Sequence, residues 1–217
     1  MTGEHSTNAS AKSAENAGKP NGLAFAARVD GLPLRKIGYA PPMLSAVTYL
    51  ADPADPDAID RLADTLGALV SGVAGGLVGD AVIVAPGNSP AVATVAEATG
   101  AVLVPYSGGN PFAVGASRAR REWILCLEAG DVPAEGWIRT LDRFIGTARP
   151  EIGIGRLRRA TTLRMRLLGG VEGLLGARTV RAGDVVRRES LAAGAGTVRK
   201  LRVRPLNGRI DRSDATY

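Results

Sequence analysis

The sequence predicts an α/β domain with one mostly parallel sheet and helices on both faces of that sheet. Apolar runs of strand length alternate along the chain with amphipathic runs of helix length, and the connections between them are short. The apolar runs are continuous, which is typical of strands that are covered on both faces. The chain has 217 residues, 45% of them hydrophobic and 22% charged, which is enough for one well-buried domain.

The chain divides into three parts by composition. Residues 1–42 hold a polar leader, followed from Gly22 by a more apolar arm that Gly and Pro interrupt. We expect the leader to be disordered, because a segment so poor in large apolar residues cannot offset its ordering entropy. A single folded domain is expected over residues 43–196. Residues 197–217 are basic and interrupted by Pro and Gly, and we expect them to form a loose tail.

The first half of the domain alternates between strands and helices. Its strands are short apolar runs that end at Pro, Gly or Asp, and its first helix repeats apolar residues at steps of three and four, which gives one buried face. The expected elements are a strand over 44–50, a helix over 57–73, a strand over 80–85, a helix over 91–99, a strand over 101–106 and a helix over 112–121.

The next strand delivers two carboxylates to its carboxyl end. The apolar run over 123–127 stops at Glu128 and Asp131, which are separated by two small residues, and an amphipathic helix is expected over 136–148. Ligands of open α/β sheets usually bind beyond the carboxyl ends of the strands, so this is the first place to look for chemistry. The alternative is a simple strand-to-helix turn in which Asp131 only caps the next helix.

An arginine-rich segment over residues 156–188 overlaps the end of a further expected strand at 151–157. Apolar residues are mixed with the arginines. The segment is therefore interpreted either as an amphipathic helix at a membrane surface or as a helix that packs its apolar side on the sheet and leaves its arginines in water. Four glycines weaken a long free-standing helix, which favours the second interpretation.

The net charge of +6 favours anionic partners such as phosphates, nucleotides, nucleic acid or anionic lipid, without choosing among them. Aromatic residues are only 4% of the chain, and no helix-turn-helix, RRM or zinc pattern accompanies the charge, which argues against nucleic acid. His5 is the only histidine, so the domain has no histidine for a hydrolytic triad. Cys126 is the only cysteine and lies inside an apolar run, which indicates a buried thiol.

The sequence has no apolar run of membrane-spanning length and no basic-then-apolar secretory signal. We therefore expect a cytoplasmic protein. Peripheral contact with the inner face of the membrane, through the arginine-rich segment over 156–188, is kept as an option.

One run of the chain carries a family motif. A helix is built around Gly115 and small residues, Glu122 precedes the strand, the strand ends in Leu-Glu-Ala-Gly-Asp, and the next helix contains Trp137. Together with the order of the elements over roughly 44–196, this run resembles the family 2 glycosyltransferases, which have the GT-A fold. In that family the strand carries Leu-Asp-Ala-Asp-Asp and is followed by a helix with Pro and Trp. The resemblance implies a nucleotide-diphospho-sugar transferase-like fold.

The resemblance also implies roles for individual residues. It assigns Asp52, Asn88 and Glu128 to a nucleotide-sugar donor, and Glu128 and Asp131 to a Mg²⁺ or Mn²⁺ ion that bridges the diphosphate. Gly130 stands where the family has a second acid, so one metal ligand is missing and the metal site is expected to be weak. The loop around Asn88 lacks the acidic residues of relatives.

A second similarity lies downstream, over residues 183–196. A Gly-Asp pair, a short apolar segment, two arginines, an acid and a Gly-containing turn follow the pattern that shapes the acceptor side in bacterial relatives. The resemblance makes Asp184 the candidate catalytic residue that takes a proton from the acceptor hydroxyl. The acidic pair that usually follows this turn is absent, because the chain from Thr197 onward is basic.

Two functions stay open at this point. The first is transfer of a sugar from a nucleotide-sugar to an unknown acceptor, with a carboxylate as base and the acids or nearby arginines balancing charge on the leaving diphosphate. The second is a catalytically inactive GT-A domain that binds a nucleotide, a partner protein or a membrane surface. The missing acids favour the second function.

Overall fold

The structure, a computed structural model, describes residues 44–149, 151–159, 179–192 and 202–213. Its strands join in one eight-stranded sheet, ordered β3-β2-β1-β4-β7-β6-β8-β5. The strands are β1 (Leu44–Tyr49), β2 (Val78–Pro86), β3 (Val102–Tyr106), β4 (Trp123–Glu128), β5 (Asp131–Pro133), β6 (Ile152–Arg159), β7 (Asp184–Arg187) and β8 (Arg202–Arg212).

The first four strands in the spatial order, β3, β2, β1 and β4, run parallel. Their sequences are continuous apolar runs because side chains on both faces are buried. In β1 and β4, for example, Val47, Ile124 and Leu125 have no exposed surface. This half of the sheet follows from alternating strands and helices, since parallel neighbours need a crossover connection.

The other half of the sheet is mixed. β7 is antiparallel to both β4 and β6, β8 is parallel to β6, and β5 is antiparallel to β8. The predicted class, a mostly parallel sheet with helices on both faces, is confirmed. The antiparallel pairs in this half of the sheet were not predicted from the sequence.

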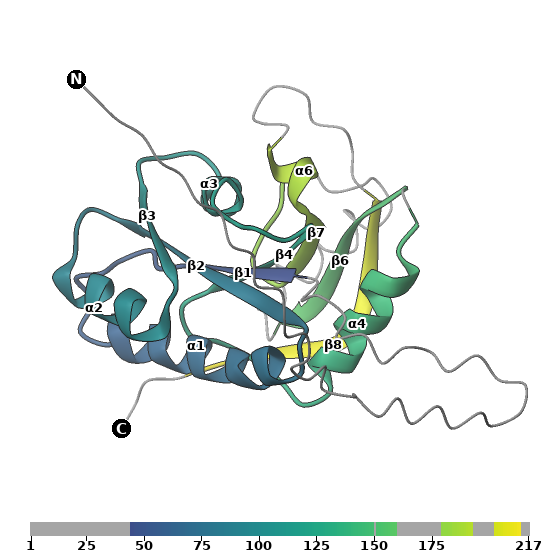
Figure 1. Cartoon of the computed structure of the whole chain (residues 1–217), viewed down its shortest axis with the longest axis horizontal. Coiled ribbons are helices and arrows are strands. Elements are labelled where there is room, and N and C mark those ends of the chain that lie inside the picture. Colours follow the sequence, from purple (N-terminus) through teal and green to yellow (C-terminus); the bar gives the residue numbers. More distant parts are fainter. Residues whose placement is uncertain (1–43, 150, 160–178, 193–201, 214–217) are drawn as a thin grey trace, which may run out of the picture. The chain divides into compact units, whose positions relative to one another are not determined.

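Helices cover both faces of the sheet (Figure 1). One core cluster joins the sheet to α1, α2 and α4, and the other joins it to α3 and α6. The helices are α1 (Ala58–Ala74), α2 (Pro90–Thr99), α3 (Pro111–Ala116), α4 (Trp137–Thr147) and α6 (Arg188–Ala192).

A glycine lets α3 approach the sheet closely. A Cβ atom on Gly115 would lie 2.3 Å from Cγ1 of Val47 and 2.9 Å from Cγ2 of Val84. The helix begins at Pro111, and the Asn110 side chain accepts hydrogen bonds from the backbone N–H groups of Phe112 and Ala113. It ends at Ala116, which is shorter than the predicted helix over 112–121.

The largest difference from the sequence prediction is at the carboxyl end. Residues 197–217 were predicted to be a loose tail, whereas Arg202–Arg212 form β8 between β6 and β5. Leu206, Gly208 and Ile210 alternate along this strand and are buried, and the two aliphatic side chains belong to the core with α4, although arginines around them hide this period-two pattern.

Several sequence predictions fall outside the described residues. The leader and arm over 1–42 and most of the arginine-rich segment, residues 160–178, lie there. The two ends of that segment are described, and they are strands: Arg156–Arg159 belong to β6, and Asp184–Arg187 form β7.

Candidate functional site

The parallel strands bring three of the predicted site residues to one edge of the sheet. β2, β1 and β4 are neighbours, and Tyr49 at the end of β1 is in register with Val84 on one side and Glu128 on the other. Asp52 and Asn88 follow the carboxyl ends of β1 and β2. Three side chains that are far apart in the sequence therefore belong to the same carboxyl edge.

Two of these residues lie in exposed loops. Asp52 is exposed, and one of its carboxylate oxygens accepts a hydrogen bond of 2.9 Å from the backbone N–H of Ala54. Asn88 is exposed directly after Gly87, whose φ of 69° turns the chain away from β2. Both side chains keep polar atoms that face solvent at this edge.

An aromatic pair lies at the same edge and was not predicted from the sequence. The rings of Tyr49 and Tyr106 meet edge to face, with centroids 5.1 Å apart. The hydroxyl of Tyr106 donates to the carbonyl oxygen of Gly109 at 2.8 Å. Burial, and then the neighbouring Tyr106 and Glu128, raise the pKa of Tyr49. The signal in the sequence was a tyrosine at the last position of each strand.

Glu128 and Asp131 are brought together by the turn between β4 and β5. The backbone N–H of Glu128 donates to Oδ2 of Asp131 at 2.8 Å, and Gly130 has a φ of 92°. The turn is fastened to α1, because the backbone N–H of Gly130 donates to Oγ1 of the buried Thr65 at 2.8 Å. Asp131 thus has a local structural role, and its side chain is completely buried.

Two arginines bind this pair of acids. Nη2 of Arg159, at the end of β6, lies 2.9 Å from Oε2 of Glu128 and 2.7 Å from Oδ1 of Asp131. Nη1 of Arg212, at the end of β8, lies 3.2 Å and 3.3 Å from the same two oxygens. We call Glu128, Asp131, Arg159 and Arg212 the acid–arginine cluster, and its four formal charges cancel.

The arginines differ in exposure. The side chain of Arg159 is 20% exposed and that of Arg212 is 45% exposed. Burial lowers the pKa of Arg159, but the charges of Asp131 and Glu128 and their hydrogen bonds outweigh this effect and raise the pKa above its usual value. The stem of Arg159 packs on Gly183, where a Cβ atom would lie 3.1 Å from its Cδ.

The residues of this cluster do not fit the divalent ion that the family resemblance implies. Mg²⁺ takes about six oxygen ligands in octahedral geometry, whereas the two facing carboxylate oxygens here already accept hydrogen bonds from two guanidinium groups. Within the described ranges, no group of three or more His, Cys, Asp or Glu side chains gathers in a way that could hold a metal ion.

Asp184 lies at the start of β7 and is completely buried. Its carboxylate forms a two-point ion pair with Arg156, with Oδ1 at 2.6 Å from Nε and Oδ2 at 2.9 Å from Nη2. The backbone N–H of Arg181 also donates to Oδ2, at 3.1 Å. Burial raises the pKa of Asp184, and these hydrogen bonds oppose but do not cancel the rise.

The structure therefore places Asp184 next to the end of β4, but in a separate ion pair from the acid–arginine cluster. The backbone N–H of Gly183 donates to the carbonyl oxygen of Cys126 at 2.8 Å, which brings the start of β7 beside β4. Arg156 forms an ion pair with Asp184, and Arg159 forms ion pairs with Glu128 and Asp131. The proposed contact of Asp184 with an acceptor hydroxyl stays a prediction.

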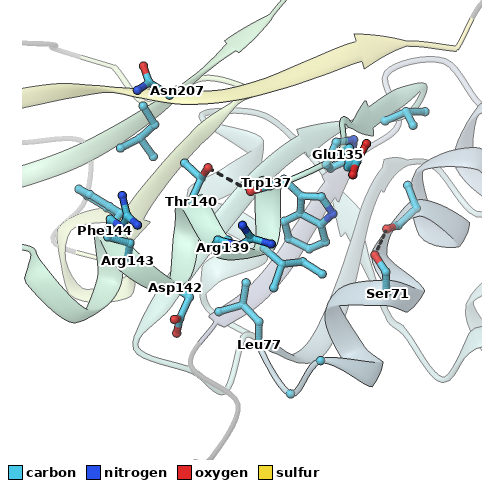
Figure 2. Close-up of a pocket in the computed structure, with 18 of the residues that line it drawn as sticks. Ser71, Leu77, Glu135, Trp137, Arg139, Thr140, Asp142, Arg143, Phe144 and Asn207 are labelled. Carbon is cyan, nitrogen blue, oxygen red and sulfur yellow. Dashed lines mark hydrogen bonds between the residues drawn. The ribbon is translucent and has the colours of Figure 1, made fainter.

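A large cavity lies elsewhere. It has a volume of about 1470 Å³ and is lined by the second half of α1, by α4 and by β8. Figure 2 shows Trp137 and Leu77 at this cavity, with Ser71 of α1 and Asn207 of β8 on either side of them. Leu77 precedes β2, so the cavity belongs to the amino side of the parallel strands, and none of the predicted site residues lines it.

Among the described residues, no helix has both the length and the apolar character that crossing a membrane requires.

The sequence matches no model of a protein family and no curated protein. Its structure is similar to a crystal structure described as a mycobacterial protein, with a TM-score of 0.51 and 13% sequence identity. That match covers 81% of this chain and 68% of the other. At this identity the likeness shows a shared fold.

The structure is also similar to glucosyl-3-phosphoglycerate synthase from Mycobacterium tuberculosis. Its complex with phosphoglyceric acid matches with a TM-score of 0.48 and 14% identity over 69% of this chain, and its complex with Mn²⁺, UDP-glucose and phosphoglyceric acid matches with a TM-score of 0.48 and 15% identity over 69%. The chain spans only 58% and 57% of those two chains.

Proposed function

We propose that this chain is a glycosyltransferase-like domain that binds a nucleotide-sugar at the carboxyl edge of β2, β1 and β4 and transfers the sugar to an acceptor. The observation that carries the proposal is the convergence of Asp52, Asn88 and Glu128 on this one edge. Open α/β sheets bind ligands there, and the motif resemblance assigns the same three residues to the donor.

The chemistry of this edge suits a nucleoside. The exposed amide of Asn88 can both donate and accept hydrogen bonds, as the edge of a base or a ribose requires. The carboxylate of Asp52 can accept from a ribose hydroxyl. The Tyr49–Tyr106 pair adds aromatic surface between the two loops.

Binding is tested with a panel of UDP- and GDP-sugars by following the melting temperature of the protein. A ligand that binds only the folded state raises the melting temperature. Asn88→Ala is expected to lower the affinity for the nucleotide-sugar by about three- to tenfold, the effect of one lost hydrogen bond. The matched control is Asn207→Ala, an exposed asparagine at the cavity. No shift with any nucleotide-sugar would refute the proposal.

A second candidate is a domain of the same fold that binds the nucleotide-sugar and does not transfer it. Two observations favour it: the candidate base Asp184 is buried against Arg156, and the acids of the motif are bound to arginines. Release of UDP or GDP from a bound nucleotide-sugar, in the presence of acceptor mixtures, separates the candidates. Binding with no release under any condition favours the inactive domain.

Peripheral membrane contact through the arginine-rich segment over 156–188 is also proposed, with the inner face of the cytoplasmic membrane as the surface. Its support is the density of arginine in that segment. Sedimentation with anionic vesicles at low salt, loss of that binding at high salt, and no binding to neutral vesicles are expected. Equal binding to neutral vesicles would contradict an electrostatic contact.

A further inference from the structure

The acid–arginine cluster occupies the place where the motif resemblance expects a metal ion. A divalent ion would be held by the carboxylates of Glu128 and Asp131. Here Arg159 and Arg212 each place one nitrogen against the same two oxygens, Oε2 of Glu128 and Oδ1 of Asp131. Two fixed positive charges thus stand where the ion would stand.

Gly130, which stands in place of the second acid, lies beside two arginines. A Cβ atom on Gly130 would lie 3.3 Å from Cδ of Arg61 and 3.6 Å from Nε of Arg212. The φ of 92° at Gly130 also disfavours a side chain. An acid at this position would be strained by the backbone and would lie beside Arg61 and Arg212.

The strand β8 holds Arg212 in position. Arg212 is in register with Asp131 in the β5–β8 pair, and the next residue, Ser213, donates its backbone N–H to the carbonyl oxygen of Gly130 at 2.7 Å. The hydroxyl of Ser213 also bonds to Asp64 of α1. Arg212 is therefore fixed on both sides of its Cα, although its side chain is 45% exposed.

The two arginines can have different roles, one toward the buried acid and one toward a bound anion. Arg159, which is 20% exposed, holds the buried Asp131. Arg212 uses Nη1 for the two acids, and a guanidinium has five N–H donors in a planar fork that matches phosphate oxygens. Because the acids are already neutralised, they do not repel an arriving anion.

We propose that the site holds the diphosphate of a nucleotide directly through the arginine pair, chiefly Arg212, without a divalent ion. The proposal rests on the proposed function, because it concerns how the same carboxyl edge takes its nucleotide. Its ligand class is a nucleoside diphosphate or its sugar ester.

The test measures the affinity of the full chain for UDP and GDP by calorimetry, once with EDTA and once with Mn²⁺. We expect equal affinity under both conditions. Arg212→Met is expected to lower the affinity for the nucleotide about tenfold or more, because a charged hydrogen-bond donor is lost. The matched control, Arg209→Met, removes an exposed arginine of the same strand that forms a local ion pair with Asp211, and it should change the affinity less than twofold.

The outcomes separate the two proposals. Binding of UDP or GDP only with Mn²⁺ overturns the arginine proposal and leaves the proposed function intact. Equal losses in the Arg212 and Arg209 variants also overturn it, because the effect would then be general surface charge. No binding of either nucleotide in any condition counts against the proposed function itself. The comparison of EDTA with Mn²⁺ needs no variant, so a variant that fails to fold does not block the test.

Discussion

Among single residues, Asp131 is a buried carboxylate that pairs with two arginines. It is completely buried, and its shortest ion pair is to Arg159, at 2.7 Å. Arg159→Met should lower the free energy of unfolding by roughly 1 to 3 kcal/mol, because it removes the shorter ion pair of a buried carboxylate and leaves the longer one with Arg212. Arg158→Met, the exposed neighbour on the same strand, should change it by less than about 0.5 kcal/mol. Urea unfolding of both variants measures the difference.

A double variant tests the reason for this cost. In Asp131→Asn with Arg159→Met the buried charge is absent, so part of the lost stability should return relative to Arg159→Met alone. If Arg158→Met and Arg159→Met cost the same, or if the double variant recovers nothing, the buried-charge explanation is wrong.

Cys126 makes a second prediction at this scale. The thiol is completely buried, and burial, followed by the nearby charge of Asp184, raises its pKa well above the usual value. A thiol reagent should therefore label the native protein only as fast as the protein unfolds, because the thiolate is the reactive form. The labelling rate is compared with the unfolding rate measured by circular dichroism. Fast labelling of the native protein would contradict the burial.

The same shift predicts a pH dependence. Since the folded-state pKa lies above the unfolded value, the contribution of Cys126 to stability is fully present below the ordinary pKa of 9.0 and is lost as the pH rises through the folded pKa. Cys126→Ala should flatten that part of the stability curve. The melting temperature between neutral and alkaline pH measures it for both proteins.

Among the elements, α3 has a glycine that packing requires, whereas Gly67 of α1 lies where a side chain has room. A methyl group on Gly115 would overlap side chains of β1 and β2, whereas one on Gly67 of α1 would meet nothing within 4 Å. Gly115→Ala should therefore destabilise the protein by roughly 1 to 3 kcal/mol through overpacking. Gly67→Ala should stabilise it by up to about 1 kcal/mol, the difference in helix propensity. Thermal or urea unfolding of both variants measures the two changes. If Gly115→Ala left the free energy of unfolding unchanged, α3 would be able to move away from the sheet.

The sequence pattern predicted some of the elements and not others. The strands and helices from β1 to β4, α4 and β6 were predicted close to their observed bounds, apart from the early end of α3 at Ala116, because each is an apolar run bounded by Pro, Gly or Asp. The pattern failed for β5, which has three residues, and for β8, where arginines and Pro205 interrupt the buried positions. When a strand is buried on one face only and charged residues surround its buried positions, its composition is the same as that of an exposed tail.

The candidate site was predictable only in part. The carboxyl edge and its residues Asp52, Asn88 and Glu128 follow from the topology of a parallel sheet. The arginine partners did not, because Arg159 and Arg212 are 31 and 84 residues away from Glu128 and reach it only through the order β6-β8-β5. Long-range pairing of this kind has no local signal in the sequence.

At the scale of the whole molecule, β8 joins parts of the sheet that would otherwise be separate edges. It pairs with β6 on one side and β5 on the other, buries Leu206 and Ile210 in the core, and brings Arg212 to Asp131. Burial of the two aliphatic side chains alone is worth about 4 kcal/mol, close to the total stability of a marginal domain.

Removal of residues 202–217 should therefore prevent cooperative folding of the whole domain and not merely trim its end, because it also exposes two strand edges that favour aggregation. Removal of residues 214–217 is the matched control, since β8 and Ser213 stay in place, and this shorter deletion should melt like the full chain. Circular dichroism and gel filtration of both chains measure the outcome. A chain without residues 202–217 that stays monomeric and melts cooperatively near the temperature of the full chain would show that β8 is an appendage to the domain, and the arginine arrangement at Asp131 would then be an addition to an already stable fold.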